Sequence, residues 1–172
     1  NSVKVYESFN KIKKKYDVII LISVLEHVKD VNTFLSKIKK HIKKNGKIII
    51  EVPSVNDPLV STYKLKYYKT NYFRKVHLHY FNKDTLNKIL KRSGLKVIKN
   101  FTKLTYSFTN HLNWLYMKKG QKNSRNATNI SLPIKIDKKM KNLFLLIDNL
   151  YKKELEKRNI GDIELVVCET QK

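Results

Sequence analysis

The 172-residue sequence predicts an α/β fold built on a parallel sheet. Residues 17–22 and 47–52 are short, mainly apolar runs, as is typical of strands buried in such a sheet. Between them, residues 31–44 place apolar side chains at helical spacing on one face and lysines on the other. Strand, helix and strand at this spacing form a βαβ unit, so the two strands should run parallel with a right-handed crossover.

The elements of this first unit have recognisable boundaries. Residues 2–6 are predicted to form a short strand ahead of it, and the strand at 17–22 is expected to be buried on both faces. Asp30 or Asn32 can cap the helix. Gly46 should end that helix, because glycine accepts the left-handed conformation at a helix C-terminus.

Residues 54–76 lose this periodicity and are rich in aromatic side chains. The segment leaves the carboxyl end of the second strand, so it can form a lid or substrate-binding insertion over that end of the sheet. The alternative is that its aromatic residues fill the edge of the domain. The sequence leaves both interpretations open.

The second half of the chain repeats the helix and strand patterns. A helix at 85–93, capped by Asn82 or Asp84, should precede a strand at 95–101. A polar loop is predicted at 118–132. A long amphipathic helix at 135–157 and a final strand at 162–169 follow. The helix is expected to face the core with Met140, Leu143, Phe144, Ile147, Leu150, Tyr151 and Leu155.

We expect one domain over residues 1–172. Its core is predicted at 16–101, with insertions at 54–76 and 102–134 and a terminal helix and strand at 135–169.

Charge and composition restrict the classes of partner. The formal net charge is +23, from 37 basic and 14 acidic residues. This charge predicts either an anionic partner such as nucleic acid or a solvated lysine-rich surface, and the scarcity of arginine favours the surface. The single cysteine, Cys168, is expected to be a small buried hydrophobe. No secretion signal or membrane-spanning run is visible, which predicts a cytoplasmic protein.

Three motifs carry a resemblance to a known family: YDVIILISVLEHV at 16–28, KKNGKIIIEVP at 43–53 and HLHYF at 77–81. Together they resemble the second half of class I S-adenosylmethionine-dependent methyltransferases. The group with an LEH motif after the fourth strand, which includes ubiquinone-biosynthesis and sugar O-methyltransferases, is the most similar. The resemblance implies a Rossmann-like fold in which this chain supplies strands four to seven, the last antiparallel, with aromatic lid insertions.

The chain departs from that family in one respect. The family's cofactor lies mainly on a glycine-rich loop after the first strand, and the four glycines here, Gly46, Gly94, Gly120 and Gly161, form no such loop. The sequence is therefore expected to be the carboxyl-terminal part of a longer methyltransferase, or a degenerate one.

The resemblance also implies site residues. Ile22, Ser23 and Leu25, at the end of the first strand of the βαβ unit, would contact the cofactor S-adenosylmethionine. In open α/β sheets, ligands bind at the carboxyl ends of the strands, which is where Glu26 and His27 follow.

Glu26, His27 and His77 are the predicted catalytic residues. Some relatives bind a divalent metal through an E-x-x-E-H motif, but Ser23 replaces its first glutamate here, so we expect no tightly bound metal. Instead, His27 or His77 would act as a general base on a substrate hydroxyl, since an imidazole titrates near neutral pH. The alternative is that Glu26 and His27 only make local contacts.

The sequence supports three functional hypotheses. The first is a methyltransferase acting on a small molecule, with O-methylation of a sugar or cell-envelope glycan precursor as the expected reaction. The second is an RNA methyltransferase, which the positive charge favours and the scarcity of arginine opposes. The third is a non-catalytic methyltransferase-like chain. Exposed edge strands would also make a homodimer plausible.

Overall fold

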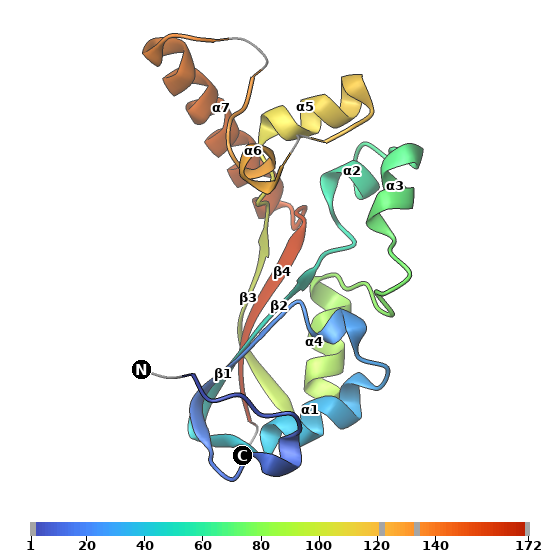
Figure 1. The fold of residues 1–172 in the computed structure, drawn as a ribbon, viewed down its shortest axis with the longest axis vertical. Helices are drawn as coiled ribbons and strands as arrows, with labels where there is room; N and C mark the ends of the chain where they lie inside the picture. The colour runs from blue at the N-terminus through green and yellow to red at the C-terminus, as the bar shows by residue number, and fades with distance from the viewer. Residues whose placement is uncertain (1–2, 121–122, 133–134, 171–172) are drawn as a thin grey trace.

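The computed structural model describes residues 3–120, 123–132 and 135–170. In this part of the chain, one four-stranded mixed sheet runs in the order β1-β2-β4-β3 (Figure 1). The strands are β1 (Tyr16–Ile22), β2 (Ile42–Pro53), β3 (Leu95–Lys103) and β4 (Ile163–Thr170). The observed architecture is therefore the predicted α/β fold.

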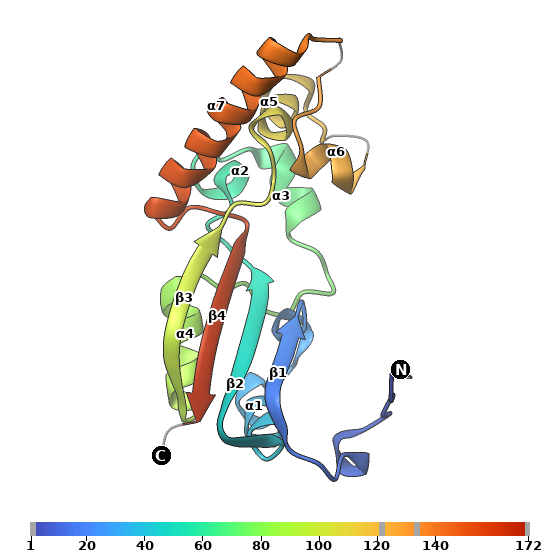
Figure 2. The ribbon, with the colours of Figure 1, turned by 90° about the vertical axis from the view of Figure 1, so that its left-hand side faces the viewer.

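The helices fall into two groups. α1 (Val31–Lys39) and α4 (Lys83–Arg92) cover one face of the sheet (Figure 2). Beyond the carboxyl ends of β1 and β2 lie α2 (Pro58–Ser61), α3 (Lys66–Tyr72), α5 (Phe108–Met117), α6 (Ser124–Thr128) and α7 (Lys138–Lys157). Two short 3₁₀ helices, η1 (Phe9–Lys11) and η2 (Leu25–His27), flank β1. No helix in the described ranges is both long and apolar enough to cross a bilayer.

The predicted βαβ unit is confirmed. β1 pairs in parallel with β2 across α1, so both strands end at the same edge of the sheet. β4 lies between β2 and β3 and is antiparallel to both, as expected of the last strand. The segments that follow β1 and β2 therefore start side by side.

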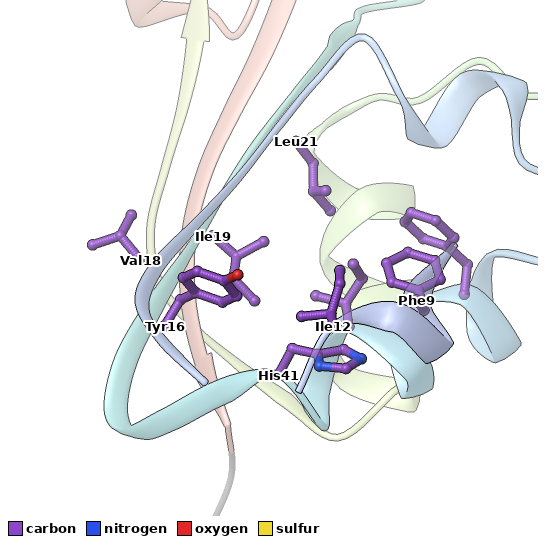
Figure 3. Close-up of a pocket in the computed structure, with 9 residues that line it drawn as sticks. Phe9, Ile12, Tyr16, Val18, Ile19, Leu21 and His41 are labelled. Carbon is purple, nitrogen blue, oxygen red and sulfur yellow. The ribbon is translucent and has the colours of Figure 1, made fainter. Parts of the chain in front are cut away.

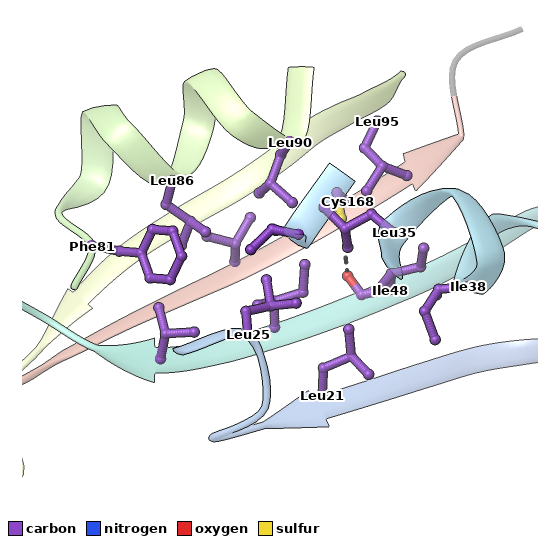
Figure 4. Packing of buried hydrophobic residues seen from close by; sticks show 14 of the residues in the cluster. Leu21, Leu25, Leu35, Ile38, Ile48, Phe81, Leu86, Leu90, Leu95 and Cys168 are labelled. Atoms are coloured by element: carbon purple, nitrogen blue, oxygen red, sulfur yellow. Dashed lines mark hydrogen bonds between the residues drawn. The ribbon is translucent and has the colours of Figure 1, made fainter. Parts of the chain in front are cut away.

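The hydrophobic core lies between the sheet and the two helices that cover it (Figure 4). Leu35 of α1 and Leu86 and Leu90 of α4 are fully buried against Ile48 of β2. Cys168 is buried there too, as predicted, and its thiol donates to the carbonyl oxygen of Ile48 at 3.5 Å. Burying these side chains supplies most of the hydrophobic stabilisation of the sheet.

The prediction that β1 is buried on both faces is wrong. Val18, Ile20 and Ile22 are 48%, 57% and 59% exposed, whereas Leu21 is buried. Side chains alternate between the faces of a strand, and α1 and α4 cover only one face here. An uninterrupted apolar run therefore did not distinguish one covered face from two.

Two predicted boundaries near β1 also need correction. Residues 3–6 of the strand predicted at 2–6 form no strand, and Val3 and Val5 are exposed; Ser2 lies outside the described residues. The helix α1 ends at Lys39, and Gly46 lies inside β2. β2 starts early because its first residues pair with the start of β1, which removes the room for a longer helix.

Capping residues were predicted more accurately. Asp30 accepts a hydrogen bond from Thr33 N at 3.1 Å and begins α1. Asn82 and Thr85 form a reciprocal capping box at the start of α4. Both helices thus begin where a side-chain oxygen satisfies a free backbone N–H group.

The two insertions contain more helix than predicted. The segment 54–76 contains α2 and α3, and α6 forms where a polar loop was predicted at 118–132. Of the stripe predicted to be buried on α7, Met140, Leu143 and Leu150 are exposed. Helix α7 contacts α5 and the end of β3, and the other four residues of the stripe, Phe144, Ile147, Tyr151 and Leu155, are half-buried.

Candidate functional site

A cleft of about 740 Å³ lies at the carboxyl ends of β1 and β2. Its walls come from these strand ends, from η2, from the segments that contain α3 and α5, and from the start of β4. This is the edge where open α/β sheets bind ligands, and the volume is in the range of small-molecule sites.

One wall is built by two segments that are far apart in the sequence. The Nδ1 atom of His27 donates to the carbonyl oxygen of Val76 at 2.8 Å. The backbone N–H groups of Leu78 and His79 both donate to the carbonyl oxygen of Glu26, at 2.7 and 3.2 Å. These bonds hold the loop after α3 against η2 and bring its histidines to the end of β1.

The three predicted catalytic residues are brought together by this arrangement. Nε2 of His27 lies 3.8 Å from Oε1 of Glu26. The rings of His27 and His77 meet edge to face, with centroids 4.8 Å apart. Glu26 is only 1% exposed, and neither of its carboxylate oxygens has a hydrogen-bond partner among the described residues.

The hydrogen bond of His27 defines its chemistry. A carbonyl oxygen can only accept, so Nδ1 of His27 carries a proton and, in the neutral ring, Nε2 is the basic nitrogen. Burial, followed by the neighbouring His27, holds the pKa of His77 below its ordinary value, which favours the neutral form of the His77 imidazole. A basic nitrogen, a carboxylate and a neutral imidazole therefore face one cleft.

The same three side chains could ligate a cation. They can each offer a ligand atom, and those atoms all lie within 4.8 Å of one another. One carboxylate and two imidazoles supply few of the oxygen ligands that a hard cation such as Mg²⁺ requires. The expectation of no tightly bound metal stays a prediction.

The predicted cofactor residues lie in three different environments. Ser23 lines the cleft at a left-handed backbone turn with φ 51°, and its N–H donates to the carbonyl oxygen of Glu51 at 3.0 Å. Ile22 is on the uncovered face of the sheet, and the side chain of Leu25 is fully buried in the core. Of the three, only Ser23 is among the lining residues of the cleft, and their assignment to the cofactor stays a prediction.

The opposite side of the cleft holds residues that the sequence did not identify. Asp57 accepts from Leu59 N at 2.7 Å and from the hydroxyl of Tyr68 at 3.0 Å. Asp162 accepts from the backbone N–H of Thr105 at 2.6 Å and from its hydroxyl. Burial raises the pKa of Asp57 to about 6, with a further contribution from the charge of Asp162.

Four aromatic side chains line the cleft with these acids, and we call them the aromatic wall: Tyr68, Tyr72, Tyr106 and Trp114. Tyr68 meets Trp114 edge to face at 4.8 Å between centroids. Burial and the charge of Asp57 raise the pKa of both Tyr68 and Tyr72, so their hydroxyls remain protonated donors.

The sequence predicted that the aromatic segment 54–76 could lie over this end of the sheet, but it gave no sign of the two acids. In the structure Asp57 is the N-cap of α2, and the sequence predicted Asp162 as the first residue of the last strand, so neither was identified as a site residue. Only the fold brings them together, because one follows β2 and the other precedes β4.

A second, smaller hollow of about 320 Å³ lies beside the beginning of β1 (Figure 3). Its lining is largely apolar and includes Phe9, Ile12, Phe34 and His41. No carboxylate lines it, so it offers no acid–base pair comparable to Glu26 and His27.

Comparison with known proteins agrees with this architecture. A family model described as a methyltransferase domain matches residues 2–100, which is more than half of the chain. Among curated proteins, none matches the sequence.

Several solved structures share the fold. A SAM-dependent methyltransferase from Thermotoga maritima, described as a possible histamine N-methyltransferase, is 15% identical with a TM-score of 0.53 over 96% of this chain. A chain from the complex of the Haloferax volcanii Trm112 methyltransferase activator with a methyltransferase is 12% identical with a TM-score of 0.51 over 95% of this chain. The present chain spans 62% and 59% of those two chains.

Proposed function

Because this chain belongs to the methyltransferase-domain family, we propose that it transfers the methyl group of S-adenosylmethionine to a hydroxyl group of a small molecule. The observation that carries the proposal is the orientation of His27. Its Nδ1 is occupied by the carbonyl oxygen of Val76, and its basic Nε2 lies in the cleft next to the buried carboxylate of Glu26.

This geometry supports general-base catalysis by His27. As the acceptor oxygen attacks, its hydroxyl proton passes to Nε2 of His27. The imidazolium that results is stabilised by the carboxylate of Glu26, 3.8 Å away. Val76 keeps the ring in the productive orientation throughout.

S-adenosylmethionine, when bound, supplies the electrophilic methyl group. We assign Ser23 to its binding, together with Ile22 at the end of β1 and Leu25 at the start of η2. The cleft suits a cationic cofactor, because Glu26 and Glu51 both line it near Ser23. The chain itself then has to align the acceptor and remove its proton.

The size and lining of the cleft favour a small acceptor over RNA. No lysine is among the lining residues in the described part of the chain, although the protein has 37 basic residues. RNA binding relies on cationic side chains that neutralise phosphates. A sugar or a cell-envelope glycan precursor, as the family resemblance suggests, would present a suitable hydroxyl.

The direct test is a methyl-transfer assay. The purified protein would be incubated with S-adenosylmethionine and a set of sugar nucleotides, quinols and phenols, and S-adenosylhomocysteine would be quantified. Acceptor-dependent release that is lost in His27→Asn and retained in His41→Asn would support the proposal. An absence of product with every acceptor would favour the non-catalytic alternative.

A further inference from the structure

The charged residues that line the cleft are mainly acidic, whereas the protein as a whole is basic. The protein carries a net charge of +23, yet four carboxylates line the cleft: Glu26, Glu51, Asp57 and Asp162. Apart from the two histidines, Arg74 is the one basic side chain among the lining residues that the structure describes, and it is exposed. A ligand that enters this cleft therefore meets more carboxylates than cationic side chains, although the protein as a whole is positively charged.

The buried acids of the cleft also lack cationic partners. Elsewhere lysines pair readily with acids, as Lys43 does with Asp17 at 2.9 Å. By contrast, no lysine or arginine nitrogen in the described part of the chain lies within 4.0 Å of the carboxylates of Glu26, Asp57 or Asp162. With 37 basic residues available, this absence is a property of the cleft.

Glu26 gives independent evidence that the cleft suits a cation. It is 1% exposed, it lines the cleft, and both of its oxygens lack a hydrogen-bond partner in the described residues. A buried carboxylate without compensation is costly, so such a group is usually matched by a ligand or a proton.

Asp57 and Asp162, on the far side of the cleft, are also carboxylates whose charge a bound cation would compensate. Their carboxylates accept hydrogen bonds from neutral groups, namely Leu59 N, Tyr68 and Thr105. Neutral donors hold the carboxylates in place without cancelling their charge. The two negative charges oppose each other, and a cation beside them would remove that repulsion.

The aromatic wall indicates what kind of cation fits. Tyr68, Tyr72, Tyr106 and Trp114 line the same cleft, and aromatic faces attract organic ammonium groups. The hydroxyl of Tyr67 donates to the carbonyl oxygen of Trp114, which holds α3 and α5 together behind this wall. Aromatic carbon does not ligate metals. Among the described residues, the cluster that could hold a metal ion includes Glu26 but neither Asp57 nor Asp162.

We propose that the methyl acceptor carries an ammonium group, and that this group binds at the aromatic wall beside Asp57 and Asp162. The acceptor hydroxyl then lies at His27, on the other side of the same cleft. Amino sugars and amino alcohols combine the two groups. The inference rests on the proposed methyl transfer for the role of the ligand, but the cation site itself can be tested without the cofactor.

The first experiment compares two probes of the same shape. Choline carries a quaternary ammonium, and 3,3-dimethylbutan-1-ol is its neutral isostere. Trp114, the single tryptophan of the chain, lines the cleft and reports binding through its fluorescence. We expect choline to change this fluorescence saturably and to bind at least about tenfold more tightly than the isostere. Equal affinities, or no saturable change with choline, would overturn the proposal.

The second experiment removes one charge. Asp162→Asn keeps an oxygen that can accept from Thr105, and it should weaken choline binding about fivefold or more while leaving the isostere unaffected. Asp17→Asn is the matched control, because Asp17 is an exposed acid outside the cleft. Unchanged choline affinity in Asp162→Asn would contradict the proposal.

The two proposals fail in different ways. If Asp162→Asn does not fold, the comparison of the two probes on the unaltered protein still decides the question. Choline binding without any methyl transfer would remove the proposed function alone. Methyl transfer without charge selectivity would remove the cation site alone.

Discussion

The carbonyl oxygen of Val76 accepts a hydrogen bond from Nδ1 of His27 at 2.8 Å, across 49 positions of sequence. This single contact selects the basic nitrogen of the ring and directs it into the cleft. It also makes the proposed catalytic geometry depend on the loop after α3, so the insertion at 54–76 helps to position His27.

Replacing His27 by asparagine should lower the turnover number by about 10² to 10⁴, because general-base catalysis contributes that much. The Michaelis constant for the acceptor should change little, since the ring removes a proton rather than holding the acceptor. Steady-state kinetics of S-adenosylhomocysteine release would measure both values. His41→Asn is the control, because His41 lines the apolar hollow of Figure 3. Equal turnover in the two variants would exclude His27 as the base.

The Glu26→Gln variant should lose activity without losing stability. The carboxylate is buried without hydrogen bonds, so a neutral amide of similar size should leave the free energy of unfolding unchanged or raise it by about 1 kcal/mol. Turnover should nevertheless fall, because the imidazolium of His27 loses its counter-charge. Chemical unfolding and kinetics on the same preparation would test both. A large loss of stability would mean that Glu26 has a structural role.

Asp57 should make stability depend on pH. Its pKa is about 6 in the folded protein and about 3.8 in the unfolded chain, so the native state holds the proton more tightly. The contribution of Asp57 to the free energy of unfolding is therefore fully present at low pH and is lost as pH rises from about 4 to 6. The loss is at most roughly 1.4 kcal/mol for each pH unit. The Asp57→Asn variant should lack this pH-dependent contribution to its free energy of unfolding.

The measurement is the free energy of unfolding of both proteins at several pH values. As pH increases through that window, the free energy of unfolding of the wild type should fall relative to that of Asp57→Asn. Above the window, the difference between the two proteins should stay constant. Parallel pH profiles would show that burial does not hold the proton on Asp57.

Gly161→Ala should destabilise the protein strongly. A Cβ atom at this position would lie 2.3 Å from the carbonyl oxygen of Lys103, which is backbone in β3 and cannot move aside easily. We expect a loss of about 3 kcal/mol or more. Gly120→Ala is a suitable contrast, because its Cβ would meet the side chain of Trp114. Thermal denaturation would compare them, and similar melting temperatures would contradict this explanation.

The sequence predicted most of the central fold because local signals agreed there. The βαβ unit, the cap at Asp30, the helix beginning after Asn82 and the antiparallel last strand all had residues of the right type at the right spacing. The cluster of Glu26, His27 and His77 at the end of β1 was predicted for the same reason, and its catalytic role stays a prediction. Glu26 and His27 directly follow a strand, and the loop containing His77 returns to them.

The features that the sequence missed depend on contacts between distant elements. The exposure of Val18 and Ile20 depends on which face the helices cover, and an apolar run does not reveal this. Similarly, α6 is a helix of five residues whose composition reads as a loop. The proximity of Asp57 and Asp162 on one side of the cleft needs the order β2-β4, which no local pattern encodes.

The position of β4 has a consequence for how the chain acquires its structure during synthesis. β3 contacts the rest of the sheet only through β4, and β4 leaves the ribosome after α5, α6 and α7 have already emerged. Until then, β1, β2 and α1 can assemble from neighbouring sequence, while β3 must wait without a partner strand. A nascent chain arrested before residue 163 should therefore hold its amino-terminal βαβ unit but leave the acidic side of the cleft unassembled.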